Sequence, residues 1–135
     1  MGKDDEPKET KPKEFIIDSQ SPYFLHLSDS LGAIITMIKF NGKNYDLWEQ
    51  VVRTALRPKN KLAFIDGKLT KPILKDGTNS AEPNAREMVN SMITSWIMNI
   101  IDLKLHPSVA YVDTAQKLLE NIRKRYSISN VPRIH

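Results

Sequence analysis

The clearest helical pattern in the sequence is MVNSMITSWIMNII, residues 88–101. Its apolar residues recur as adjacent pairs at four-residue steps, from Met88 and Val89 to Ile100 and Ile101. This spacing places them on one face of a helix for roughly four turns, which is typical of a helix packed in a protein core. We therefore expect this helix to lie at the centre of the fold, with Trp96 facing inwards.

Two other segments show an apolar stripe with the same period. The first begins at Tyr45, after the potential cap Asn44, and Pro58 ends it. The second follows Asp113, which forms a capping-box pattern with Gln116. The core residues that we expect from the three helices are Trp48, Val52, Leu56, Met92, Trp96, Ile100, Leu118 and Ile122.

Three apolar stripes of this kind must face one another, so the sequence predicts an all-α fold, a small helical bundle with an extended N-terminal lead-in. Residues 1–20 are expected to form a disordered polar arm, because residues 1–14 carry no apolar side chain after Met1. Residues 21–135 form the predicted helical domain. Within its lead-in, residues 34–40 resemble a β-strand, and Asn41-Gly42 is a turn signal.

Several function classes lack the residues that they require. The chain has no cysteine, its three histidines lie far apart, and its five glycines are scattered singly. We therefore expect no enzyme activity, no metal, no cofactor and no small-molecule substrate. No apolar run approaches the roughly 20 residues that span a bilayer, and the N-terminus lacks a secretory pattern, so the expected location is intracellular, cytoplasmic or nuclear.

The charge is unevenly distributed along the chain. Residues 1–14 hold four of the 20 basic and five of the 16 acidic residues, so the remainder carries 16 bases against 11 acids, a net charge of +5. A basic body suits a polyanionic partner through phosphate contacts, although a solvated helical surface explains the same composition. Trp48 and Trp96 lie within apolar stripes, which favours core packing over stacking on bases.

Several short blocks occur in a recognisable order. They are SPYFLHLSD (residues 21–29), FNGKNYDLW (40–48), RTALRPKNKLAFIDG (53–67), VNSMITSWI (89–97) and YVDTA (111–115). In order and spacing they resemble the N-terminal Gag region of plant copia-type LTR-retrotransposon polyproteins, over residues 21–135. The sequence departs from this family by lacking tryptophan near Arg86 and at Leu119, and we expect the domain to be truncated at its C-terminus.

The resemblance implies a capsid-like bundle that associates with itself as a homo-oligomer and packages RNA, with no membrane partner. The alternative is a domesticated or relic fragment that acts as an RNA-binding or protein-interaction adaptor. The candidate RNA phosphate contacts are Arg53, Arg57, Lys59, Lys61, Arg123, Lys124 and Arg125. For residues 59–61 the equal alternative is that they only shape a turn. Alanine at both lysines is expected to leave folding almost unchanged, as for exposed charges.

Overall fold

Five helices and no strand occur in the residues that the computed structural model describes, 16–69, 81–109 and 112–127. They are α1 (Tyr45–Leu56), α2 (Ala63–Asp66), α3 (Ala81–Asn99), the 3-10 helix η2 (Leu103–Ser108) and α4 (Ala115–Tyr126). This confirms the predicted small all-α fold. Residues 1–15 of the predicted polar arm lie outside the described residues, and residues 16–20 are exposed.

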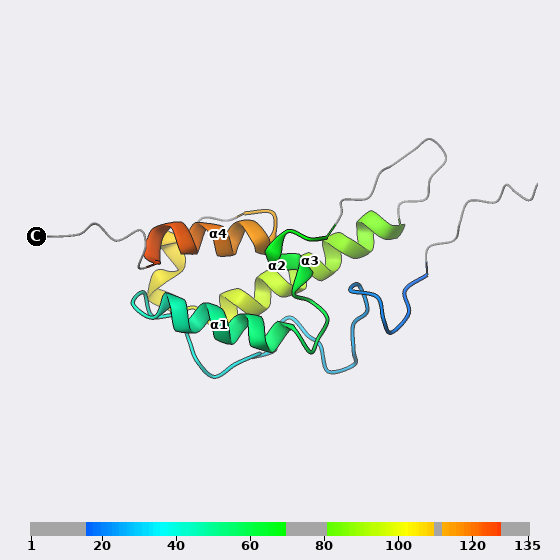
Figure 1. Cartoon of the computed structure of the whole chain (residues 1–135), viewed down its shortest axis with the longest axis horizontal. Coiled ribbons are helices and arrows are strands. Elements are labelled where there is room, and N and C mark those ends of the chain that lie inside the picture. The colour runs from blue at the N-terminus through cyan, green and yellow to red at the C-terminus, as the bar shows by residue number, and fades with distance from the viewer. Residues whose placement is uncertain (1–15, 70–80, 110–111, 128–135) are drawn as a thin grey trace, which may run out of the picture.

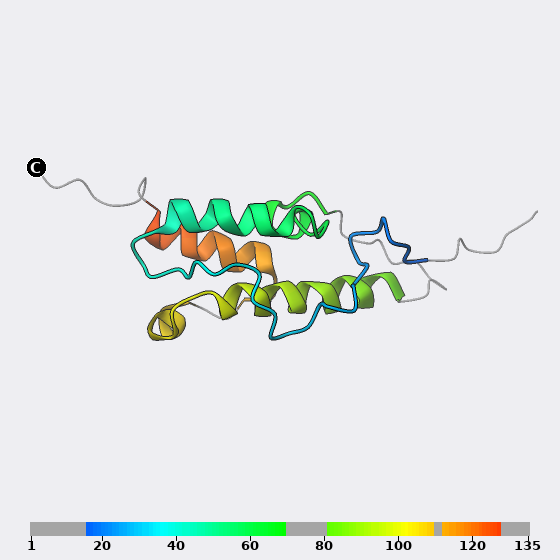
Figure 2. The ribbon, with the colours of Figure 1, turned by 90° about the horizontal axis from the view of Figure 1, so that it is seen from below.

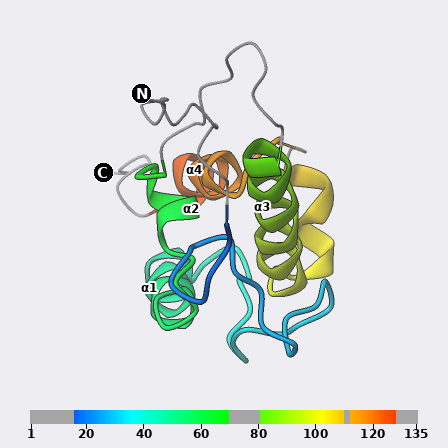
Figure 3. The same cartoon turned by 90° about the vertical axis from the view of Figure 1, so that its right-hand side faces the viewer.

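The three long helices lie side by side (Figures 1 and 2). Both α2 and α3 contact α4. Figure 3, viewed nearly along the helices, shows α1, α3 and α4 around a common centre, with η2 outside α3. The apolar stripes predicted from the sequence therefore meet in one core.

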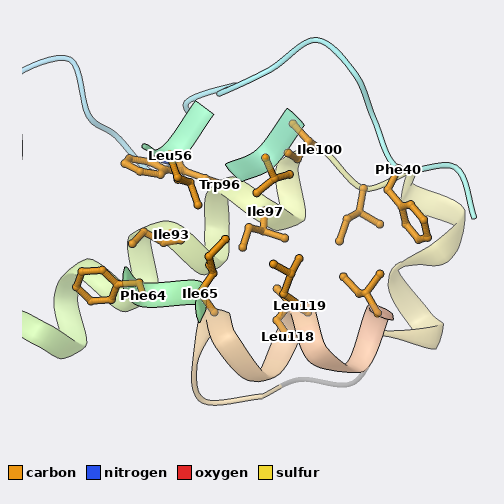
Figure 4. Packing of buried hydrophobic residues seen from close by; sticks show 14 of the residues in the cluster. Phe40, Leu56, Phe64, Ile65, Ile93, Trp96, Ile97, Ile100, Leu118 and Leu119 are labelled. Atoms are coloured by element: carbon orange, nitrogen blue, oxygen red, sulfur yellow. The ribbon is translucent and has the colours of Figure 1, made fainter. Parts of the chain in front are cut away.

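The core contains seven of the eight residues expected from the sequence, including both tryptophans. Figure 4 shows Trp96 among the packed core side chains. Met92 is the exception, because it is only partly buried and packs against the edge of the cluster. The buried face of α3 is centred on Ile93, Trp96 and Ile97, which places Met92 at the border of the stripe. Met88 lies outside the core and is 63% exposed.

The predicted start of α1 at Tyr45 is confirmed, but Asn44 does not cap the helix with its side chain. Its Oδ1 accepts a hydrogen bond from the Asn41 N–H at 2.9 Å, and its Nδ2 donates to the Lys39 carbonyl at 3.0 Å. Asn44 therefore closes the turn that leads into α1.

The predicted cap of α4 is wrong by one residue. Thr114, rather than Asp113, is the N-cap, and its Oγ1 accepts from the Lys117 N–H at 3.1 Å. Both residue types are good caps, and Thr114 is the one with an extended backbone next to the first helical residue.

The β-like segment, residues 34–40, does not form a strand. Only Phe40 makes a bridge, which is parallel to Ile101 and uses the Phe40 N–H to Ile100 carbonyl bond at 2.8 Å. The apolar residues of this segment do not share one face, because Phe40 is buried in the core whereas Ile34, Met37 and Ile38 are exposed.

Residues 18–33, here called the strap, lie between α1 and α3 (Figure 3). Tyr23 is the only buried residue of residues 16–39, and its ring meets the edge of the Phe64 ring at a centroid distance of 6.1 Å. The strap is therefore a surface segment with one buried apolar side chain, beside which the partly buried Leu25 and Ala33 also pack against the core.

Candidate functional site

Within the described ranges, no three His, Cys, Asp or Glu side chains come together as metal ligands. None of the described helices combines the length and the apolar character needed to cross a membrane. The described surface has three notable features. They are the hydrogen-bonded strap, the basic C-terminal end of α4 and a group of exposed apolar side chains in residues 27–38.

The connection between α1 and α2 contacts the strap at three points, through residues 59–61. Asn60, whose backbone is left-handed (φ 60°), donates from Nδ2 to the Gln20 carbonyl at 3.0 Å. The Lys59 Nζ lies 3.1 Å from the Asp29 Oδ1, in a salt bridge whose carboxylate is only 1% exposed. Such a shielded ion pair is screened by salt far less than a surface pair.

Lys61 supplies the third contact, and it is buried at 1% exposure. Its Nζ donates to the Phe24 carbonyl at 2.7 Å and to the Lys59 carbonyl at 3.2 Å. Burial lowers the pKa of Lys61, because the charged amine has lost water. This burial removes Lys61 from the candidate phosphate contacts, which corrects the expectation based on its charge.

The same geometry corrects the expectation that alanine at Lys59 and Lys61 leaves folding unchanged. Truncating Lys61 leaves the Phe24 carbonyl without its lysine donor, and an unsatisfied buried acceptor costs about 1–3 kcal/mol. For residues 59–61, these contacts favour the structural alternative of the two that the sequence left open.

Asp29 stays charged although it is buried. Burial acts to raise its pKa, but the hydrogen bonds from the His26 N–H and from Lys59 outweigh burial and hold the pKa below its ordinary value. The Lys59 amine also lies 5.2 Å from the centroid of the Trp96 ring, within the range of a cation–π contact. Lys59 is therefore occupied by two partners from different parts of the chain.

Helix α3 contacts the strap from the other side. The Trp96 Nε1 donates to the Ser30 carbonyl at 2.6 Å, and the Asn99 Nδ2 donates to the carbonyls of Leu31 and Ala33 at 2.9 and 3.1 Å. We use the name receiving surface for the side chains that bind strap carbonyls in this way, Asn60, Lys61, Ser95, Trp96 and Asn99.

The receiving surface joins three blocks that the sequence analysis could identify only separately. Residues 21–29 belong to the strap, Asn60 and Lys61 to the block 53–67, and Ser95 and Trp96 to the block 89–97, whereas Asn99 follows the last block. Sequence reasoning missed the role of Asn99 and of Ser95, whose only signal was their position beside Trp96. Because the accepting atoms are backbone carbonyls, the side chains of the strap do not indicate that it binds these donors.

Of the other predicted basic contacts, two lie in α1 or at its end. Arg53 is partly buried, and its Nε and Nη2 donate to the Glu49 Oε2 at 3.2 and 3.1 Å. Arg57 is exposed at the C-terminal end of α1. The internal ion pair satisfies the charge of Arg53, so Arg57 is the better candidate of the two for an external anion.

Arg123, Lys124 and Arg125 are all exposed in the last turn of α4. Positive charge at this end also complements the helix dipole. Arg125 donates from Nη1 to the Ser108 carbonyl, and a hollow of about 400 Å³ lies beside this contact. Its lining residues are Ser108, Val109, Asn121, Ile122, Lys124, Arg125 and Tyr126.

Two buried polar atoms, the Tyr45 Oη and the Trp48 Nε1, have no hydrogen-bond partner among the described residues. Tyr45 borders a cavity of about 140 Å³ that is also lined by Glu49, Arg53 and Arg123. Burial, and then the nearby Glu49 carboxylate, raise the pKa of Tyr45, so its hydroxyl stays neutral at physiological pH. Side chains of both signs line this cavity, which therefore shows no preference for an anion or a cation.

A short stretch of the chain exposes an unusual number of large apolar side chains. Five of them lie within residues 27–38, at Leu27, Leu31, Ile34, Met37 and Ile38. Single exposed apolar residues are ordinary, whereas a concentration of them marks a surface suited to association.

Residues 26–73 match the family model described as the Gag-polypeptide of LTR copia-type. The match includes α1, α2, the residues 59–61 that contact the strap, and the second half of the strap. It confirms the resemblance to copia-type Gag. Neither the search of curated proteins nor the search of solved structures gave a match.

Proposed function

We propose that the chain is a non-enzymatic Gag-like structural domain of a copia-type retrotransposon, which self-associates inside the cell during assembly of a capsid or virus-like particle. The match of residues 26–73 to the copia-type Gag model carries this proposal. Gag polypeptides are structural and non-catalytic, so the activity to be explained is association.

The exposed apolar residues of the segment 27–38 supply a physical basis for self-association. Burying apolar surface is favourable by roughly 25 cal/mol per Å², and closed symmetric dimers use the same patch on both copies. Leu27 and Met37, the latter 89% exposed, offer side chains that pack on little of their own chain. A second copy that covers them removes this apolar surface from water.

The test is analytical ultracentrifugation of the full chain over a wide concentration range. The average mass should rise with concentration, and Leu27→Glu with Met37→Glu should weaken association at least tenfold, because burying a charge opposes contact. Leu103→Glu is the matched control, since Leu103 is 79% exposed on η2. A strict monomer at every concentration would overturn the proposal. If Leu103→Glu weakened association equally, the segment 27–38 would not be the association surface.

RNA binding is the second candidate function, supported by the exposed basic residues Arg57 and Arg123–Arg125. We expect binding of single-stranded RNA that weakens steeply with salt. Lys124→Gln should lower the slope of log K against log salt by about 0.7, the change for one phosphate contact, whereas Lys104→Gln on η2 should leave it unchanged. If the chain retained no RNA at low salt, this function would be contradicted.

RNA binding without self-association instead favours the role of a domesticated adaptor.

A further inference from the structure

We propose that the strap exchanges between copies, so that residues 18–33 of one chain occupy the receiving surface of a second chain and the reverse. This inference rests on the proposed self-association and specifies its mode. The partner is a second copy of this chain, and the interface that it fits is the one the strap already uses within a single copy.

The contacts that hold the strap are suited to exchange, because every residue that binds the strap follows the short segment 34–39 in the chain. Asn60, Lys61, Ser95, Trp96 and Asn99 bind five strap carbonyls, and Lys59 binds Asp29. Every one of these donors comes after residue 40. A strap from another copy therefore forms the same bonds, with no new complementarity required.

The strap also keeps its shape by its own bonds and can move as a unit. The Phe24 N–H donates to the Ser21 carbonyl at 3.1 Å, and the Ala33 N–H donates to the Ser30 carbonyl at 3.2 Å. Tyr23, the buried apolar side chain of the strap, packs against Phe64 of the body, ten residues before the end of the strap at residue 33. A segment with its own turns and its own buried side chain is the kind of element that exchange can transfer intact.

Residues 34–39, here called the hinge, connect the strap to Phe40. The hinge makes no backbone-to-backbone hydrogen bond with the described residues. Six extended residues reach at most about 20 Å, enough to carry a strap away from its own body towards a neighbour. Phe40 is buried and bridged to Ile101, so it fixes the point at which the hinge starts.

The exposed apolar residues of the hinge explain why an exchanged pair would be favoured over two closed copies. All strap contacts are equal in the two states, so the difference lies in the hinges. In an exchanged pair the two hinges run next to one another, and Ile34, Met37 and Ile38, which are exposed in one copy, can cover their counterparts. This new apolar contact opposes the entropy lost on association.

Cysteine crosslinking tests the exchange directly, because the natural chain has no cysteine. The Ser95 Oγ lies 3.1 Å from the Leu31 carbonyl, so positions 31 and 95 are adjacent. Leu31→Cys and Ser95→Cys are made in separate full-length chains, unfolded together in urea, refolded at a concentration that gives dimers, and treated with a short bismaleimide. Exchange is expected to give a covalent heterodimer.

The matched control pairs Leu31→Cys with Glu87→Cys, an exposed position eight residues earlier on α3 and therefore about 12 Å away along the helix. The 31/95 mixture should yield at least ten times more heterodimer than the 31/87 mixture. Both substitutions in one chain, diluted until monomeric, should crosslink internally, and a failure there overturns the strap placement and the proposal with it.

The crosslinking yields and the sedimentation data together distinguish a failure of exchange from a failure of self-association. Equal yields from the two mixtures, in a sample that sediments as a dimer, overturn exchange and leave self-association standing through direct contact of exposed faces. A sample that stays monomeric at every concentration overturns both. A strong preference for the 31/95 pair supports both.

Discussion

Trp96→Ala is expected to lower the free energy of unfolding by about 3–5 kcal/mol. The indole is fully buried, and its Nε1 donates to the Ser30 carbonyl at 2.6 Å. The substitution therefore leaves a cavity in the core and an acceptor without its donor. Domains of this size are stable by only about 5–15 kcal/mol, so the variant should lose a large part of its folded population. Urea denaturation followed by circular dichroism measures the change.

Met88→Ala is the matched control for this substitution, because Met88 belongs to the same helix and is largely exposed. We expect its cost to stay within about 0.5 kcal/mol, as for other surface positions. Trp96→Phe keeps most of the apolar volume but removes the bond to Ser30 and leaves a smaller cavity, so its cost should be intermediate. A Trp96→Ala variant that unfolds at the natural urea midpoint would show that α3 is not the central helix.

Phe40→Ala is expected to have an effect of similar size, about 3–5 kcal/mol. Phe40 is fully buried, and its ring centroid lies 5.1 Å from that of Trp48 and 5.0 Å from that of Tyr126. The ring thus joins the start of α1 to the end of α4. Thermal denaturation should show a Tm lower by about 10–20 °C.

Met37→Ala provides the comparison for Phe40, since it removes a large apolar side chain three residues earlier where the chain is exposed. Its Tm should remain within about 2 °C of the natural chain when both are measured at a concentration low enough to exclude association. If Phe40→Ala behaved like Met37→Ala, Phe40 would not close the core between α1 and α4.

The helices were predictable because periodicity is a local property of the chain. The apolar residues from Val89 to Ile97 define one face of α3 whatever the rest of the protein does, and both tryptophans lie in the core as predicted. The last pair, Ile100 and Ile101, is also buried but follows the end of the helix at Asn99. The cap of α4 was less certain, because Asp113 and Thr114 are adjacent residues of the same chemical preference. The extended backbone of Thr114 and the hydrogen bond that its Oγ1 accepts from the Lys117 N–H distinguish them.

Lys61 shows where composition misleads. A lysine side chain normally faces water, and charge alone placed Lys59 and Lys61 among the candidate phosphate contacts. In the fold, the stem of Lys61 is buried and its amine reaches a carbonyl 37 residues away in sequence. A backbone carbonyl exists at every residue, so the sequence contains no mark of which one will accept the bond.

The sequence by itself determined the helical class, the core faces of the long helices and the resemblance to copia-type Gag, because each depends on residues close together in the chain. Tertiary structure alone decided that residues 59–61 clamp the strap and that Leu27 and Met37 remain in solvent. Burial of a side chain depends on which distant segments meet. That meeting is a property of the whole packed chain, and a local pattern does not contain it.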